Sequence, residues 1–143
     1  MHTIAVLALP DTIAFDLCTA AETFGRVMLP SGEPGYRVLV CGTEPVVSAG
    51  PMRIATDHGI EAAAEADTIV VPGRNDVTVG TSGDVLRALT SAHAAGTRIA
   101  SICSGAFTLA EAGLLDGKRA TMCRHRSRPA DAPADVSTCP SST

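Results

Sequence analysis

A cysteine stands where a predicted strand gives way to a predicted helix. Residues 101–107 read Ser-Ile-Cys-Ser-Gly-Ala-Phe, so small residues follow Cys103 directly. This order is typical of a nucleophile elbow, in which a sharp turn presents a reactive side chain at a helix N-terminus. The helix dipole there favours a thiolate, and the free N–H groups of the first turn can stabilise an oxyanion. The alternative is a cysteine that ends a core strand as a small buried hydrophobe.

Asp16 is the second residue that could take part in chemistry at this turn. It lies in Ala-Phe-Asp-Leu-Cys, at the start of a segment with helical spacing. An acid that opens a helix can be an N-cap and nothing more. If it faces Cys103 instead, its effect depends on its proton: a carboxylate disfavours a thiolate beside it, whereas a protonated Asp can donate a hydrogen bond to the sulfur.

A glycine loop follows another predicted strand, in the sequence Val-Pro-Gly-Arg at residues 71–74. Gly73 allows a positive φ or a close approach of the backbone, so the loop can supply a second N–H group to an oxyanion. An ordinary turn between strand and helix is the alternative.

The remaining candidate residues form no site by their spacing. The four histidines lack metal-ligand spacing, and the five cysteines are irregularly spaced with no C-x-x-C pair. We therefore expect neither a metal site nor a disulfide framework. Two roles are open for Glu22, which lies on the first predicted helix among apolar positions: a partly buried acid near the site or, as we expect, a solvated helix acid.

The composition favours one globular domain. Its 143 residues are 45% hydrophobic and 18% charged, with a formal net charge of −4. A nucleic-acid groove needs clustered Lys and Arg, whereas Lys118 is the single lysine, so we expect no direct binding of nucleic acid. No apolar run approaches the ~20 residues of a membrane span, and no signal peptide is evident. We therefore expect a cytoplasmic protein that does not bind membranes.

Short apolar runs rich in Val and Ile alternate with segments of helical spacing. Continuous runs of this kind are typical of strands buried on both faces of a parallel sheet. The alternation predicts an α/β fold, a doubly wound, flavodoxin-like and mainly parallel sheet with helices on both faces. The runs lie at residues 3–9, 36–41, 67–71 and 98–103; helices are expected at 17–28, 83–95 and 104–112, a short helix at 60–66, and a hairpin from 46–48 and 52–55.

The functional crevice of such a fold lies beyond the carboxyl ends of its strands. Residues 10–11, 72–76 and 103–105 occupy those ends, and the helix that carries Asp16 starts on the same side. One acid, one thiol and one glycine loop are therefore expected at a common rim.

The end of the chain has a different composition. Residues 123–143 contain no Leu, Ile or Phe and have several prolines. Such a segment buries too little apolar area to offset an ordering cost of ~1–2 kcal/mol per residue. We predict a domain at 1–122 followed by a disordered or aberrant tail at 123–143.

Taken together, these motifs resemble the ThiJ/PfpI superfamily, a class I glutamine-amidotransferase-like fold. More narrowly, they are similar to the N-terminal domain of GlxA-type AraC-family transcriptional regulators. The Cys elbow and the later Ala-Gly-Leu-Leu-Asp-Gly-Lys-Arg-Ala-Thr are the specific parts of the match. The matching stretches are residues 4–10, 15–25, 36–42, 70–73, 101–107 and 110–121.

The resemblance implies roles for several residues. Cys103 is the elbow cysteine and Asp16 takes the family's acidic position, with oxyanion N–H groups from Gly73 or its neighbour Arg74 and from Ser104. We expect Gly105 to lie at the same site. Related isonitrile hydratases use the same Cys and Asp without a cofactor, so none is expected here. The regulators are thought to sense a small molecule, and family members commonly form homodimers.

The chain departs from the family pattern after residue 121. Met122-Cys123-Arg124 stands where the family continues Thr-His-Trp, which suggests a frameshifted or truncated product without the helix-turn-helix module. Three functions follow as hypotheses. The first is a small-molecule-sensing domain of a GlxA-type regulator that lacks its DNA-binding half. The second is a stand-alone cysteine enzyme, an isonitrile-hydratase-like or glyoxalase-like lyase, and the third is an inactive remnant.

Overall fold

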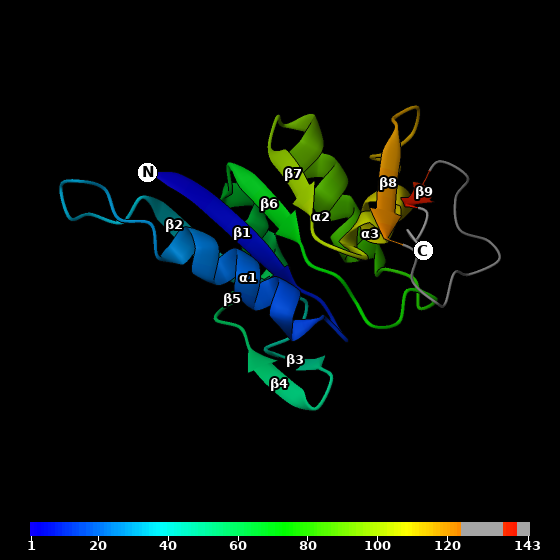
Figure 1. Ribbon diagram of the computed structural model, residues 1–143, viewed down its shortest axis with the longest axis horizontal. Helices are drawn as coiled ribbons and strands as arrows, with labels where there is room; N and C mark the ends of the chain where they lie inside the picture. The colour runs from blue at the N-terminus through cyan, green and yellow to red at the C-terminus, as the bar shows by residue number, and fades with distance from the viewer. Residues whose placement is uncertain (124–135, 140–143) are drawn as a thin grey trace.

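The structure, a computed structural model, describes residues 1–123 and 136–139. Its centre is a five-stranded sheet in the order β5-β2-β1-β6-β7, with every pair of neighbours parallel (Figure 1). All four apolar runs predicted as strands lie in this sheet, so the α/β fold class is confirmed. The strands are β1 (His2–Ala8), β2 (Tyr36–Gly42), β5 (His58–Gly59), β6 (Thr68–Val71) and β7 (Arg98–Ser101).

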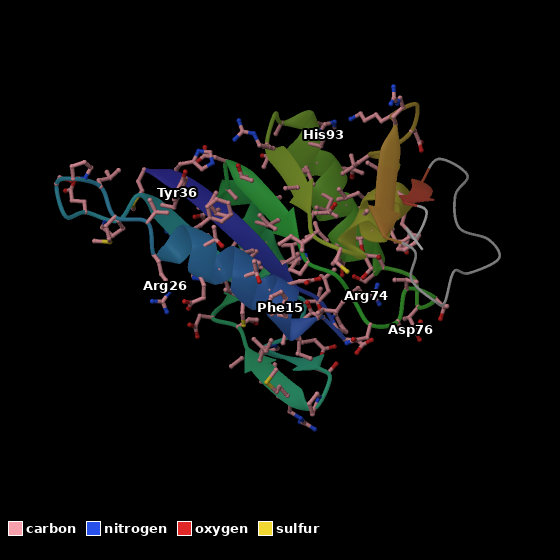
Figure 2. The ribbon with its side chains drawn as sticks, in the orientation of Figure 1. Phe15, Arg26, Tyr36, Arg74, Asp76 and His93 are labelled. Carbon is pink, nitrogen blue, oxygen red and sulfur yellow. The ribbon has the colours of Figure 1, made fainter. Side chains whose placement is uncertain are left out.

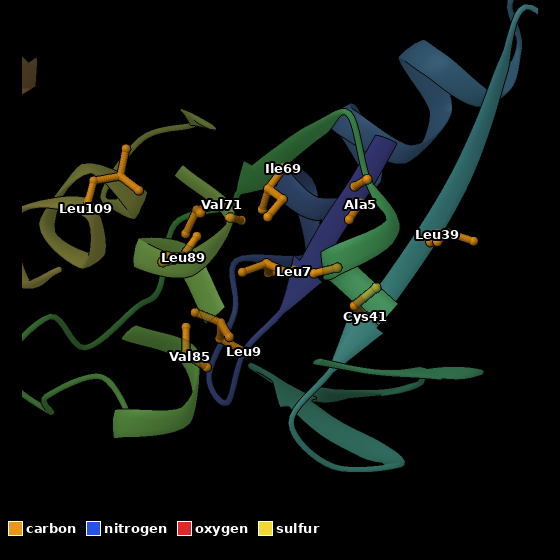
Figure 3. Close-up of a cluster of buried hydrophobic side chains, with 13 residues drawn as sticks. Ala5, Leu7, Leu9, Leu39, Cys41, Ile69, Val71, Val85, Leu89 and Leu109 are labelled. Carbon is orange, nitrogen blue, oxygen red and sulfur yellow. The ribbon is translucent and has the colours of Figure 1, made fainter. Parts of the chain in front are cut away.

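The two faces of the sheet follow from the alternation of side chains along β1, whose residues 4–8 are at most 2% exposed. Ala5 and Leu7 belong to one buried cluster, whereas Ile4 and Val6 belong to the other. Figure 3 shows the first cluster, which α2, α3 and η1 cover. The second lies under α1. The helices are α1 (Ala14–Gly25), the 3₁₀ helix η1 (Ile60–Glu65), α2 (Gly83–Ala94) and α3 (Gly105–Glu111).

A small antiparallel hairpin lies outside the central sheet, as expected. Its strands are β3 (Val46–Ala49) and β4 (Met52–Ala55). Val47 is buried and joins the cluster under α1. The hairpin therefore packs against the same side of the molecule as α1 (Figure 1).

Two elements end earlier than predicted. The first helix ends at Gly25, and residues 27–28 turn back, with the Gly35 N–H donating to the Val27 carbonyl at 2.8 Å. The glycine and the Pro30 that follows are poor helix formers, which accounts for the early end. β7 ends at Ser101 rather than at residue 103, and Arg98 and Ser101 are exposed because β7 is an edge strand.

The expected tail overlaps a second small sheet. β8 (Ala120–Cys123) pairs in parallel with β9 (Val136–Cys139). Residues 136–139 of the tail thus form a strand, whereas the sequence predicted no regular structure there. Composition does not reveal this strand because its backbone hydrogen-bond partners come from β8. The rest of the predicted tail, 124–135 and 140–143, lies outside the described residues.

Candidate functional site

The strand-to-helix turn around Cys103 has the geometry of an elbow. β7 ends two residues before Cys103, and α3 begins two residues after it. Cys103 has a φ of 52°, a left-handed conformation that costs an L-residue roughly 1–2 kcal/mol. Its side chain is exposed. The cysteine therefore does not end a core strand but stands on a strained turn at the carboxyl edge of the sheet.

Gly105 lets the start of α3 approach β6 closely. A Cβ at this position would lie 2.1 Å from the carbonyl oxygen of Val71 and 2.9 Å from that of Pro72. The Gly105 N–H donates to the carbonyl of Ile102 at 3.0 Å. In this conformation Gly105 is thus a packing residue of the elbow, and its N–H is not directed at a ligand.

Asp16 is held at the elbow by the glycine loop. Its side chain is 7% exposed, and its Oδ2 accepts a hydrogen bond from the Gly73 N–H at 3.2 Å. The N-cap of α1 is Ile13, without a side-chain cap bond, so the cap alternative for Asp16 is wrong. The acid instead reaches across from the third residue of the helix to the loop that follows β6.

Ser104 joins the elbow to the same loop. Its Oγ accepts from the Arg74 N–H at 2.9 Å and donates to the Arg74 carbonyl at 2.8 Å. A Cβ on Gly73 would lie 2.6 Å from Asp16 Oδ2 and 2.8 Å from Ser104 Oγ. These two oxygens are therefore at most about 5.4 Å apart, the sum of the two distances. The structure brings α1, the glycine loop and the elbow together, as the sequence predicted.

The hydrogen bonds change the set of available oxyanion donors. The N–H of Gly73 is used by Asp16 and that of Arg74 by Ser104. The N–H of Ser104 donates to no group among the described residues. Of the donors named from sequence, Ser104 alone remains free to bind an oxyanion beside Cys103.

Asp11 lies on this rim, where the sequence placed it, but its structural role in holding the loop after β6 was not predicted. It has a φ of 61°, and its carbonyl accepts the Asn75 N–H at 3.0 Å while its Oδ2 accepts the Asp76 N–H at 2.9 Å. The signal was present, since Asp tolerates the left-handed region better than most residues and directly follows a strand and a proline. Figure 2 shows Asp76 beyond Arg74 on the loop after β6.

A cavity of about 290 Å³ lies next to this rim, on the other side of Arg74. Its wall includes Leu9, Thr43, Ile60, Arg74, Thr81 and Val85, and neither Cys103 nor Asp16 lines it. Sequence reasoning missed this cavity because its wall combines segments far apart in the chain. Arg74 is the one predicted site residue that contributes to it.

The other candidates lie away from the elbow. Glu22 is exposed and pairs with Arg26 one turn later, as expected of a solvated acid. Cys41 is buried between strands, where burial above all, and Glu61 and Glu65 in addition, raise the pKa of its thiol to about 11. In the described part of the chain, no three His, Cys, Asp or Glu side chains are grouped so that they could hold a metal.

Comparison with known proteins identifies the domain. A sequence profile of the DJ-1/PfpI family matches residues 2–129. The chain belongs to the DJ-1/PfpI family. An uncharacterised protein from the cpoL 5′ region of Streptomyces lividans is 36% identical over 122 residues, which cover 84% of this chain and 86% of that protein.

Transcriptional regulators are also similar to this DJ-1/PfpI domain. The HTH-type transcriptional regulator GbdR of Pseudomonas aeruginosa is 27% identical over 118 residues, which cover 81% of this chain and 32% of the regulator. The chain thus spans about a third of that relative. In an AraC family transcriptional regulator from Pseudomonas putida the fold is shared at a TM-score of 0.68 and 16% identity, over 98% of this chain and 77% of that one.

DJ-1 itself has the same fold. Oxidised DJ-1 of Toxoplasma gondii superposes with a TM-score of 0.72 at 22% identity, covering 99% of this chain and 84% of that chain. No helix in the described ranges has both the length and the apolar character to cross a membrane.

Proposed function

We propose that this DJ-1/PfpI domain is the small-molecule-sensing part of a GlxA-type AraC-family regulator. The observation that carries the proposal is the similarity to GbdR, an HTH-type regulator of which this domain accounts for 32%. The fold shared with a second AraC-family regulator supports it. A sensing domain needs a ligand site but no turnover, and the cavity beside the rim offers such a site.

Direct ligand binding tests this proposal. The full chain is screened against small metabolites by thermal shift, and hits are followed by calorimetry and by NMR of the compound over several hours. A sensor gives saturable binding and leaves the compound unchanged. Conversion of a hit at a rate that Cys103→Ser abolishes would refute the sensing role in favour of an enzyme. The chain alone is expected to give no specific DNA shift at physiological salt because its net charge is −4.

A second candidate function is a cofactor-independent cysteine hydratase or lyase. The strained, exposed Cys103 beside the free Ser104 N–H favours it. In this reaction the Cys103 thiolate attacks the carbon of a polar multiple bond, and the π electron pair moves to the neighbouring heteroatom, where the Ser104 N–H stabilises the charge until Asp16 donates a proton to it. Water then adds to the same carbon and gives a proton to Asp16, the C–S bond breaks, and the thiolate is regenerated.

The reactivity of the thiol tests the enzyme candidate. Cys18 is a matched control because it is also an exposed free thiol but lies on α1 outside the elbow. An activated Cys103 is alkylated faster than Cys18 at pH 7. Equal rates would count against an activated thiol.

We further propose a cytoplasmic homodimer. Cys18, Cys41 and Cys103 are free thiols, as expected in a reducing compartment. Large apolar side chains are exposed on α1 and on the β3–β4 hairpin: Phe15 is 79% exposed, Met52 53% and Val46 46%. Sedimentation velocity tests the dimer, and a purely monomeric chain at micromolar concentration would exclude it.

A further inference from the structure

The cavity beside Arg74 has the features of an anion site that is separate from the elbow. Its walls come from the ends of β1 and β2, from η1, from residues 79–82 and from the first turn of α2. We propose that this cavity binds a small carboxylate through the guanidinium of Arg74. This inference rests on the proposed sensing function, because it assigns a chemical class to the molecule that is sensed.

The first argument is the buried charge of Arg74. The residue is 8% exposed, and no carboxylate forms an ion pair with it among the described residues. Its Nε donates to the Pro10 carbonyl at 3.3 Å and its Nη1 to Thr81 Oγ1 at 3.5 Å, both long bonds. Pro10 and Thr81 both line the cavity, so the guanidinium lies in the wall between them.

The donors of this guanidinium are largely unused. An arginine has five N–H groups, and Nη2 has no hydrogen-bond partner in the part of the chain that the structure describes. The guanidinium thus has two long hydrogen bonds to neutral oxygens and no carboxylate partner, and a cationic side chain so little exposed is stabilised when an anion pairs with it. A carboxylate fits because its two oxygens match the planar fork of arginine.

A second, independent observation concerns Thr43, another residue of the cavity wall. The hydroxyl oxygen of Thr43 is buried and has no hydrogen-bond partner, alone among the buried side-chain polar atoms of the described residues. Thr43 lines the same cavity. Such an orphaned hydroxyl needs an explanation. Because the oxygen is covered as it stands, a polar ligand group in the cavity becomes its partner when the side chain rotates towards the cavity.

The start of α2 adds unpaired donors. Its N-cap, Ser82, makes no side-chain cap hydrogen bond, and the Leu86 N–H is the first to bond back to the Ser82 carbonyl. Ser82, Asp84 and Val85 line the cavity. The N–H groups of the first turn and the helix dipole both favour a negative charge there.

Acidic side chains near the cavity oppose a highly charged anion, so we expect a ligand with a single negative charge. Glu44 in the wall is exposed and therefore screened by water, and Asp84 is paired with Arg87. Asp76 lies outside the wall, and its pKa is lowered mainly by the hydroxyl and N–H of Thr78 and least by Arg74. A volume of about 290 Å³ is near the lower limit of ligand pockets, roughly 300–1,000 Å³. With apolar walls from Leu9, Ile60 and Val85, the fitting ligand is a monocarboxylate with a short apolar part.

Binding of butyrate to the full chain tests the proposal, with neutral butyramide as the matched ligand control. We expect saturable binding of butyrate by NMR titration and at least tenfold weaker binding of butyramide. Arg74→Lys keeps the charge but loses the fork, and is expected to weaken butyrate binding at least tenfold. Arg26→Gln, which removes an exposed arginine at the far end of α1, leaves the affinity within twofold.

Two further variants keep the result interpretable. Thr43→Val removes only the unpaired hydroxyl, so it folds, and it should weaken butyrate binding several-fold. Cys103→Ser should bind butyrate as the wild type does. Butyrate binding that depends on Cys103 but not on Arg74 would place the anion at the elbow and overturn the inference. The inference is also overturned if butyrate does not bind and a metabolite from the screen binds equally well to the wild type and to Arg74→Lys. In that case the proposed sensing role would still stand.

Discussion

Replacing Gly105 by alanine should push the start of α3 away from the end of β6. The added Cβ would lie 2.1 Å from the Val71 carbonyl oxygen, whereas real Cβ atoms essentially never approach closer than 3.0 Å. Both close atoms, the carbonyl oxygens of Val71 and Pro72, belong to backbone and cannot rotate away. The start of α3 must therefore move by nearly 1 Å, the difference between these two distances.

The size of the effect follows from what moves with the helix. Overpacking of this kind costs typically ~1–3 kcal/mol. Ser104 precedes Gly105 and is bonded twice to the backbone of Arg74, at 2.8 and 2.9 Å, so a shift weakens those bonds as well. We expect Gly105→Ala to lower the free energy of unfolding by about 3 kcal/mol, the upper end of that range.

Urea unfolding followed by far-ultraviolet circular dichroism measures this change, because the chain has no tryptophan. Gly25→Ala is the matched control: it ends α1, no atom lies within 4 Å of its added Cβ, and it should gain up to about 1 kcal/mol. The alkylation rate of Cys103 should change in Gly105→Ala but not in Gly25→Ala. If Gly105→Ala unfolds within 0.5 kcal/mol of the wild type, on the order of the usual surface effect, the close approach of α3 to β6 is refuted.

Four other outcomes are expected. Cys103→Gly should be at least ~0.5 kcal/mol more stable to urea than Cys103→Ala, because glycine relieves the left-handed strain of about 1–2 kcal/mol at some entropic cost; equal stabilities would mean that the turn is not strained. Asp16→Ala should cost about 1–3 kcal/mol in unfolding free energy by leaving the buried Gly73 N–H without an acceptor, whereas Asp16→Asn keeps one and should cost much less; equal losses would contradict that role. Cys41 should resist alkylation in the native chain at pH 8 while Cys18 reacts, as peptide mapping will show. The pKa of the Cys41 thiol is raised from 9.0 to about 11 in the folded chain, so the folded chain holds this proton more tightly than the unfolded chain does. The protonated thiol therefore contributes to the free energy of unfolding in full below pH 9, and the contribution is lost as the pH rises toward 11. A free energy of unfolding that stays constant across that interval would exclude the shift.

Much of the candidate site follows from local sequence. Small residues after Cys103 predict a tight turn, and Gly113, with a φ of 71°, ends the helix where the sequence placed its stop. The carboxyl ends of parallel strands share one edge, which is why Asp16, the glycine loop and the elbow could be expected at one rim. The pairing of hydrogen-bond groups could not be predicted, because it depends on distances of a few tenths of an ångström between segments. Asp16 thus takes the Gly73 N–H that sequence reasoning assigned to an oxyanion.

The sequence by itself determined the sheet and the elbow, since apolar runs, glycines and small residues act through local sterics and burial. Only the tertiary structure decided what Arg74 and Thr43 do. Arg74 and Thr43 are 31 positions apart in the chain. They line one cavity because β2 and β6 end, and α2 begins, at the same edge of the sheet. Periodicity reports which face of an element is buried, but the contents of a cavity depend on how several elements pack, and that is set by all of their contacts at once.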